Sequence, residues 1–306
     1  MPTTRRQFLH SSTLAGAGLF LSSLNSYAKP MATQSALGYS VLVFGTNWGF
    51  NGSTSELCAK LKQAGYDGLE VWWPSAEKDQ RELFESFEKN NLKVGFLVGS
   101  GEMDFKKHQI QFQQNLEAAA KAKPVYINCH SGKDFFSFEQ NLQLITFSNG
   151  LAASSGVPIY HETHRGRALY AAPITKNFIT SNSALRITLD ISHWCNVHES
   201  YLQGQEETVA QTLSRTDHIH ARIGHPEGPQ VSDPRAPEWA DAVKHHFDWW
   251  DKVVETKKKE GKRITFLTEF GPPDYMPTLP YTRQAVADQW AINVYMMEVL
   301  RKRYSA

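Results

Sequence analysis

The stretch VPIYHETHRGR, residues 157–167, carries the pattern that decides the fold: a short apolar run ending in a potential metal ligand, Glu162. Three later stretches repeat this pattern and supply Asp190 with His193, then His220, then Glu269: RITLDISHW (186–194), HIHARIGH (218–225) and FLTEFGPP (266–273). Each run is typical of a strand buried on both faces. Because the strands of a parallel β/α barrel all end around one mouth, we expect these four ends to converge there.

The rest of the chain extends this alternation to eight strand–helix units, most of them spaced by the roughly thirty residues that a βαβ crossover needs. The predicted strands are 39–44, 66–73, 92–98, 124–128, 157–160, 186–189, 218–221 and 263–267. The predicted helices are 53–65, 76–90, 105–121, 138–154, 175–181, 206–214, 238–260 and 281–303. The pattern predicts an α/β fold, a parallel eight-stranded (β/α)8 TIM barrel over residues 39–306. A doubly wound open sheet is the alternative, but it would gather ligands at one switch point.

The N-terminal residues have the composition of a targeting segment. Arg5 and Arg6 form a twin-arginine pair, a short apolar stretch follows, and Ser26-Tyr27-Ala28 offers a cleavage site. We therefore interpret 1–28 as a twin-arginine signal peptide and 29–38 as a linker. The apolar stretch is too short for stable membrane insertion. A periplasmic or secreted enzyme, loaded with its cofactor before export, is the expectation.

Composition excludes several classes of protein. The chain has 306 residues, 41% of them hydrophobic, which suffices for a large core. Its formal net charge is +1, without the basic surplus of nucleic-acid-binding proteins. Its three cysteines, Cys58, Cys129 and Cys195, do not form a disulfide framework, and we expect buried free thiols, although a pair such as Cys129 with Cys195 stays open.

The motifs HETH, LDISHW, HIHAR and TEFG, taken together, resemble the xylose isomerase-like TIM barrel superfamily, the sugar phosphate isomerase/epimerase family. The resemblance covers nearly all of the chain after the signal peptide. It implies that Glu162, Asp190, His220 and Glu269 hold one divalent metal ion, with His193 beside it. An acid after a strand is more often a helix cap than a ligand, but four such residues on successive strands are harder to attribute to capping.

The ligand set indicates the chemistry. Three carboxylates and one imidazole suit Mn²⁺ best, with Mg²⁺, Co²⁺ and Zn²⁺ as alternatives. Such an ion polarises a sugar carbonyl and makes the neighbouring C–H acidic. Glu162 and Glu269 are then the expected catalytic acid/base pair. Returning the proton to the other face gives epimerisation, moving it to the next carbon gives isomerisation, and expelling a β-substituent gives elimination.

Further residues near the predicted strand ends form a candidate substrate-binding shell: Glu70, Trp72, His130, His164, Arg165, His193 and Arg222. Glu70 and Trp72 share strand parity and would point inward together. Family members often carry a carboxylate where Arg222 stands, so we expect Arg222 to anchor substrate. The late strands lack a glycine-rich phosphate cradle, since Pro272 and Pro273 follow Gly271. The expected substrate is a non-phosphorylated sugar or keto-sugar.

Four functions remain to be separated. The first is a metal-dependent sugar isomerase or epimerase. The second is a lyase or hydratase acting by β-elimination on a 3-keto-glycoside or inosose. An endonuclease IV-like phosphodiesterase is disfavoured by the near-neutral charge, and a non-catalytic sugar binder by the two retained glutamates. The expected partner is a small-molecule carbohydrate, with no nucleic acid and no membrane insertion; a homo-oligomer is left open.

Overall fold

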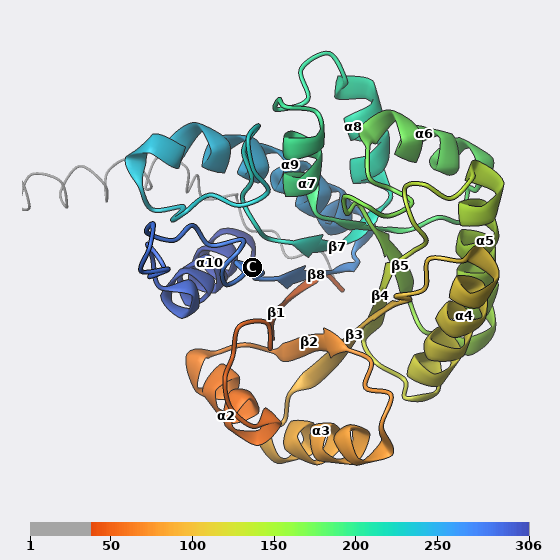
Figure 1. The fold of residues 1–306 in the computed structure, drawn as a ribbon, viewed down its shortest axis with the longest axis horizontal. Helices are drawn as coiled ribbons and strands as arrows, with labels where there is room; N and C mark the ends of the chain where they lie inside the picture. Colours follow the sequence, from red (N-terminus) through yellow and green to blue (C-terminus); the bar gives the residue numbers. More distant parts are fainter. Residues whose placement is uncertain (1–37, 306) are drawn as a thin grey trace, which may run out of the picture.

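The computed structural model describes residues 38–305, and in this range eight parallel strands close into a barrel in sequence order, with helices around them (Figure 1). The predicted TIM barrel is therefore confirmed. The strands are β1 (Ser40–Thr46), β2 (Gly68–Trp72), β3 (Lys93–Gly99), β4 (Tyr126–His130), β5 (Ile159–Glu162), β6 (Ile187–Leu189), β7 (Thr216–His220) and β8 (Arg263–Leu267). The predicted signal peptide and residues 29–37 of the linker lie outside the described residues.

Strand alternation divides the core into two parts. Val43 and Leu69 face outward and pack with helix residues such as Leu57 and Leu61 in the main apolar cluster. The neighbouring Phe44 faces inward, where it meets the edge of Tyr126 with ring centroids 5.3 Å apart. Adjacent strand residues point to opposite faces, so every strand contributes to both parts. The barrel is thus filled by side chains, and its polar groups lie above this aromatic layer.

The helices that cover the barrel are α2 (Thr54–Ala64), α3 (Glu77–Asn90), α4 (Phe105–Lys121), α5 (Phe138–Ser155), α6 (Ala172–Ser181), α7 (Ile191–Val197), α8 (Glu206–Ser214), α9 (Ala240–Glu260) and α10 (Gln289–Tyr304). Ser53 and Glu56 form the predicted capping box of α2. Gly65 ends that helix at φ 97°, a left-handed conformation that favours glycine.

Three predicted helix boundaries are wrong, and one helix was missed. The closing helix begins at Gln289 rather than at 281, because the segment before it folds back through a bridge between Thr278 and Ala285. The helix expected from 238 begins at Ala240, after a 3-10 turn, and the one expected from 175 begins at Ala172. The missed helix, α7, follows β6 with only Asp190 between them.

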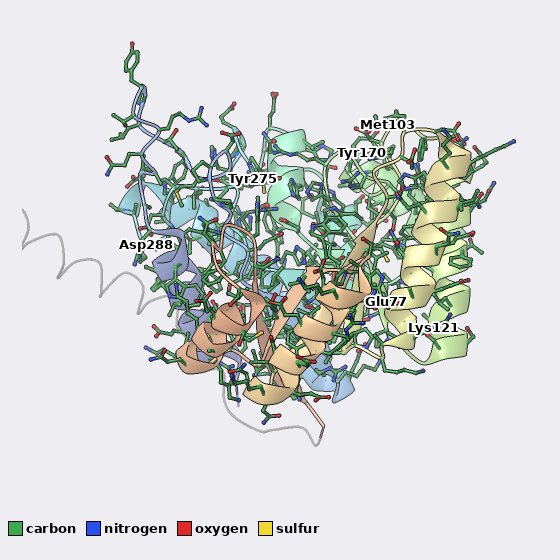
Figure 2. The ribbon with its side chains drawn as sticks, turned by 60° about the horizontal axis from the view of Figure 1, so that its bottom comes forward. Glu77, Met103, Lys121, Tyr170, Tyr275 and Asp288 are labelled. Atoms are coloured by element: carbon green, nitrogen blue, oxygen red, sulfur yellow. The ribbon has the colours of Figure 1, made fainter. Side chains whose placement is uncertain are left out.

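The described part of the chain also tests two smaller expectations. Cys58, Cys129 and Cys195 are all buried free thiols, as predicted, so Cys129 and Cys195 are not paired. Within residues 38–305, no helix combines the length and the apolar character needed to cross a membrane. Figure 2 shows the barrel turned so that the loops after the strands lie uppermost, with Met103 and Tyr275 at this end and Lys121 lower on α4.

Candidate metal centre and substrate cavity

The four predicted metal ligands come together at the mouth of the barrel. Glu162 is the last residue of β5 and His220 the last of β7, while Asp190 directly follows β6 and Glu269 lies two residues beyond β8. One ligand atom from each lies within 4.8 Å of the others. Glu162, Asp190 and His220 are buried, and the side chain of Glu269 is 14% exposed. Glu269 is therefore the ligand that faces the open side.

His220 is the centre of this group. Its Nδ1 lies 2.9 Å from Glu269 Oε2 and 3.5 Å from Glu162 Oε1. All three atoms are buried and make no hydrogen bond. Buried polar atoms are normally satisfied, so three unsatisfied atoms that face one another indicate a missing partner. A divalent cation fits this place, because it would accept a lone pair from each atom.

Asp190 is engaged differently. Its Oδ1 accepts hydrogen bonds from the backbone and hydroxyl of Ser192, as the N-cap of α7. Its Oδ2 accepts from Nη2 of Arg222, whose side chain is 1% exposed. The same Nη2 lies 2.7 Å from His193 Nε2 and 3.6 Å from Glu269 Oε2. Arg222 thus neutralises part of the negative charge that the carboxylates create.

The carboxylates determine the protonation of this cluster. Burial disfavours the imidazolium of His220, but Glu269, Glu162 and Glu70 outweigh burial and hold its pKa well above the ordinary value. Burial likewise opposes ionisation of Glu162, yet His220 and His130 hold the pKa of that carboxyl well below its usual range. Burial raises the pKa of Asp190 to about 6, against the effect of Arg222. The negative field that attracts a proton to His220 would equally attract a metal cation.

A cavity of about 420 Å³ opens directly above the cluster. Its walls combine aromatic and apolar groups with a few polar ones: Thr46, Asn47, Trp48, Gly49, Glu70, Val71, Trp72, Leu97, His130, His164, Arg222, Leu267, Glu269 and Tyr275. The volume lies in the range of about 300–1,000 Å³ that is usual for small-molecule sites. Of the predicted substrate-binding shell, Glu70, Trp72, His130, His164 and Arg222 line this cavity.

Histidines connect the cavity to the ligands. His130 Nε2 lies 3.0 Å from Glu162 Oε2, and the edge of Trp72 packs against the His130 ring. His164 lies between His130 and His193, with ring centroids 4.5 Å and 3.9 Å away. Burial holds the pKa of both His164 and His193 well below the ordinary value, so both are neutral near pH 7. His164 and His193 therefore offer neutral donors and acceptors rather than positive charge.

Two predicted residues lie behind the cavity wall. His193 is fully buried against Asp190 and Arg222. Arg165 donates from Nη1 to Asn196 Oδ1 at 3.1 Å, and its guanidinium lies 5.2 Å from the centre of the Tyr275 ring. The sequence analysis missed Tyr275, which also covers the guanidinium of Arg222 at 4.7 Å. It lies in the loop between β8 and α10, and no local pattern in the sequence marks it.

Glu70 lies deeper than a substrate contact would. It is 2% exposed, and its carboxylate oxygens face Tyr126, His218 and His220. Burial opposes its ionisation, but His220 and His218 hold the pKa of Glu70 below its ordinary value. Asn128, also missed, donates from Nδ2 to Glu162 Oε2 at 2.7 Å. Tyr126 and Asn128 carried no signal in the sequence, because barrel closure alone brings them to this cluster. His218 belongs to the HIHAR motif, but its contact with Glu70 was not predicted.

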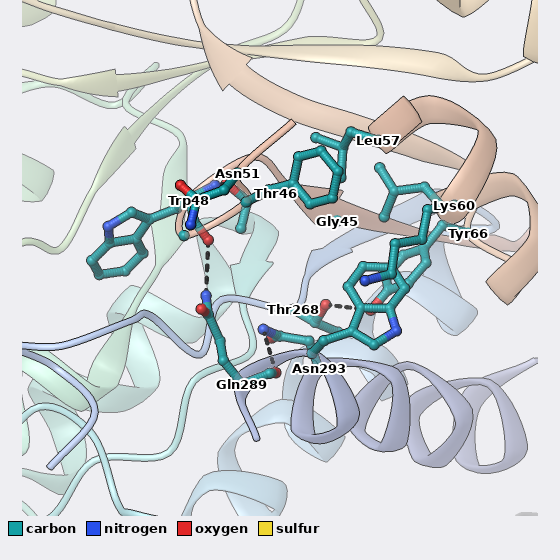
Figure 3. Close-up of a pocket in the computed structure, with 14 residues that line it drawn as sticks. Gly45, Thr46, Trp48, Asn51, Leu57, Lys60, Tyr66, Thr268, Gln289 and Asn293 are labelled. Atoms are coloured by element: carbon teal, nitrogen blue, oxygen red, sulfur yellow. Dashed lines mark hydrogen bonds between the residues drawn. The ribbon is translucent and has the colours of Figure 1, made fainter. Parts of the chain in front are cut away.

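A second, smaller cavity of about 110 Å³ lies behind the mouth, between the β1 loop, α2 and α10 (Figure 3). Gln289 Nε2 donates to the carbonyl oxygens of Trp48 and Phe270, at 2.8 Å each. Tyr66 and Thr268 share a hydrogen bond of 2.9 Å between their hydroxyls. These bonds fix the two residues that flank Glu269 and the loop that carries Trp48. We interpret this region as support for the larger cavity.

The sequence matches no protein-family model, and it matches no curated protein. Solved structures match it over most of its length. A xylose isomerase-like TIM barrel protein from Mycobacterium smegmatis, in complex with magnesium, has a TM-score of 0.57 at 9% identity, covering 86% of this chain and 98% of its own.

Two further solved structures are similar. The 3-keto-D-glucoside 4-epimerase YcjR from E. coli has a TM-score of 0.55 at 14% identity, over 86% of this chain and 99% of its own. The probable 3-DHS dehydratase AsbF from Bacillus anthracis has a TM-score of 0.53 at 16% identity, over 85% of this chain and 98% of its own. At these identities the likeness establishes the fold.

Proposed function

We propose that this protein is a divalent-metal-dependent sugar isomerase or epimerase that acts on a non-phosphorylated sugar or keto-sugar. The observation that carries the proposal is the convergence of Glu162 Oε1, His220 Nδ1 and Glu269 Oε2, three buried atoms without hydrogen-bond partners, beneath a cavity of ligand size. The neighbouring solved structures support an enzyme of this kind, since they include an epimerase, a dehydratase and a magnesium-bound barrel.

The ion would be held by Glu162, Asp190, His220 and Glu269, and Mn²⁺ is our first choice, with Mg²⁺, Co²⁺ and Zn²⁺ as alternatives. A divalent ion in this place supplies Lewis acidity, which makes the C–H beside a sugar carbonyl acidic. Of these residues, Glu269 alone is both a ligand and part of the cavity wall.

We assign the two glutamates to opposite sides of the reacting carbon. Glu269 faces the cavity and takes the proton from the substrate. Glu162 is buried and does not reach the cavity itself. His130 lies between Glu162 and the cavity, with its Nε2 3.0 Å from Glu162 Oε2. His130 is therefore placed to exchange the proton on the other face, with Glu162 behind it. Trp48, Trp72 and Tyr275 offer aromatic faces for the sugar ring.

The contacts of Arg222 in the cavity wall favour a substrate without a phosphate group. Arg222 is buried against Asp190 and lies 3.6 Å from Glu269. A guanidinium with two carboxylate neighbours does not offer the open bidentate clamp that phosphate recognition uses. Its role here is to hold Asp190.

A lyase acting on a 3-keto-glycoside or inosose is the second candidate. The specific observation in its favour is the pair of imidazoles in the wall, His130 and His164, which lie within reach of a departing β-oxygen. The first proton transfer would be the same in both reactions. Only the fate of the resulting carbanion would differ.

The test is proton exchange followed by NMR. Protein loaded with Mn²⁺, Mg²⁺ or Co²⁺ is incubated in D₂O with a panel of ketoses and 3-keto-glycosides. We expect deuterium at the carbon beside the carbonyl, together with a new epimer or isomer. Glu269→Gln should lower the rate by about 10²–10⁴-fold. Glu255→Gln, on the exposed face of α9, is the matched control and should exchange like the wild type.

Release of an aglycone or water would replace the first candidate by the second. Loaded protein that exchanges no proton with any member of the panel would contradict both. So would a Glu269→Gln variant as active as the wild type.

A further inference from the structure

Glu70 lies directly beneath the candidate metal centre, on the opposite side of His220. It is the middle residue of β2, and its side chain points into the barrel, where it is 2% exposed. Its Oε1 lies 3.2 Å from His220 Nε2. The other nitrogen of the same ring, Nδ1, faces Glu269 and Glu162. The His220 ring therefore spans from Glu70 on one side to the proposed ion on the other.

We infer that Glu70 is a positioning residue: it accepts the Nε2–H of His220, fixes the tautomer and orientation of that ring, and so leaves Nδ1 bare for a metal ion. This inference rests on the proposed function. A neutral imidazole carries one N–H, so a nitrogen that gives its lone pair to a metal requires the proton on the other. A carboxylate behind a ligating histidine serves this purpose in many metal sites and makes the imidazole a stronger donor.

The surroundings of Glu70 hold it in an acceptor role. Tyr126 donates its hydroxyl to Oε2 at 2.8 Å, and His218 Nε2 lies 3.1 Å from the same oxygen. On its other side, His218 Nδ1 lies 2.8 Å from the hydroxyl and 3.1 Å from the carbonyl oxygen of Thr265, which holds the ring in place beside Glu70. Two strands, β4 and β7, thus direct the Tyr126 hydroxyl and the His218 and His220 rings at the carboxylate that β2 carries.

Asn128 does not compete for this role. Its Nδ2 is 3.1 Å from His220 Nε2, but it also lies 2.7 Å from Glu162 Oε2 and donates there. An amide N–H cannot accept the proton that His220 must hold on Nε2. Glu70 is then the acceptor for that proton.

Glu70→Gln tests the inference because glutamine keeps the size of the side chain and loses the charge. Its amide also replaces one acceptor oxygen by an NH₂ group, which then faces either His218 or His220. We expect the dissociation constant for Mn²⁺, measured by calorimetry on the full chain, to rise about 10- to 100-fold. The visible absorption spectrum of the Co²⁺-loaded variant should also differ, since the imidazole ligand has changed orientation or basicity.

Tyr126→Phe is the second variant, and it removes only one of the three donors to Glu70. We expect a smaller, several-fold loss of Mn²⁺ affinity. Glu255→Gln on α9 is the control for the loss of one negative charge, and its affinity should equal that of the wild type. The thermal unfolding of metal-free Tyr126→Phe shows whether the barrel is intact.

The outcomes separate the two proposals. Wild-type protein that binds no divalent ion overturns the proposed function, and this inference with it. Wild-type protein that binds Mn²⁺, with Glu70→Gln binding it equally well and giving the same Co²⁺ spectrum, overturns the role of Glu70 alone. If Glu70→Gln does not fold, Tyr126→Phe becomes the test of the inference. A folded Tyr126→Phe protein that binds Mn²⁺ as tightly as the wild type then contradicts it.

Discussion

Arg222 and Asp190 form an ion pair at the barrel mouth in which neither side chain is more than 1% exposed. Desolvation makes such a pair costly to build, and removing one partner leaves a buried charge without compensation. Burial would lower the pKa of Arg222, but Asp190 and Glu269 hold it above the ordinary value. Three carboxylates, Glu162, Asp190 and Glu269, face one guanidinium here. The two negative charges left over are the charge that one divalent ion would balance.

Replacing Arg222 should therefore destabilise the metal-free protein strongly. We expect Arg222→Met to lower the free energy of unfolding by roughly 3–5 kcal/mol, because Asp190 would stay buried without its partner. A divalent ion should recover part of this loss, since it would take over the role of the cation. Urea denaturation with and without Mn²⁺ measures both effects.

Arg235→Met is the matched control for that experiment. Arg235 pairs with Asp233 in the loop after β7, where the two side chains are 38% and 23% exposed. A pair this exposed contributes at most about 1 kcal/mol. A loss for Arg222→Met as small as that for Arg235→Met would contradict the account of the buried pair.

Removal of the metal should lower the free energy of unfolding by an amount that depends on the ion concentration and the dissociation constant. At a free ion concentration of 100 times the dissociation constant, binding to the folded state alone adds about 2.7 kcal/mol. We expect chelator-treated protein to regain this amount when Mn²⁺ is restored. Glu162→Gln should gain much less, since it loses one of the three unsatisfied atoms. Identical thermal unfolding of the wild type with and without every tested ion would count against the site.

The sequence predicts the barrel well because its two signals are local. A strand buried on both faces is a short apolar run, and its partner helix has a capping residue and a helical apolar spacing. The convergence of Glu162, Asp190, His220 and Glu269 was predicted for a related reason, since side chains at the ends of four such runs meet wherever the strands meet. Trp72 and His130 lie together on the cavity wall, while their role in binding substrate stays a prediction.

What the sequence could not predict depends on long-range closure or on competing local signals. Tyr126 and His218 look like ordinary strand residues until barrel closure places both on Glu70. Helix α7 was not predicted, because its N-cap, Asp190, directly follows β6 and was interpreted only as the end of that strand. The helix predicted from 281 starts later because Tyr281 and Arg283 adopt positive φ. Tyr275 lies before that segment, and only the fold brings it over Arg222.

Trp72 offers a test of the cavity that leaves the metal untouched. Its side chain lines the cavity and remains 50% exposed, so its removal should change the free energy of unfolding by less than about 0.5 kcal/mol. If its ring supports the substrate, Trp72→Ala should raise KM by about 5-fold, as expected for the loss of roughly 1 kcal/mol of aromatic contact. Phe135→Ala, an exposed aromatic residue outside the cavity wall, should leave KM unchanged. Equal KM values for all three proteins would remove Trp72 from the substrate site.

At the opposite end of β7, Asp217 links the barrel to its helices and should make stability depend on pH. Its carboxylate accepts from Arg186 Nη2 at 2.8 Å and lies 2.8 Å from the ammonium of Lys257, which is fully buried. Burial opposes ionisation of Asp217, but the bonds to Arg186 and Lys257 outweigh it and hold the pKa below the ordinary value. A carboxyl whose folded-state pKa is depressed stabilises the fold above its unfolded pKa of about 3.9, and this stabilisation is lost as the pH falls through the folded-state value.

Asp217→Asn should therefore cost most near neutral pH. We expect a loss of roughly 1–3 kcal/mol at pH 7, because Arg186 and Lys257 would each lose a charged hydrogen-bond partner, while Lys257 keeps Glu260 at 3.0 Å. The difference from the wild type should shrink below about pH 4, where the wild-type carboxylate begins to lose its own advantage. Asp248→Asn, in an exposed pair with Lys244, should cost less than about 1 kcal/mol at either pH. Denaturant unfolding at pH 7 and pH 3.5 measures these free energies of unfolding. If Asp217→Asn loses the same free energy of unfolding at both pH values, the ionised carboxylate is not what stabilises this junction.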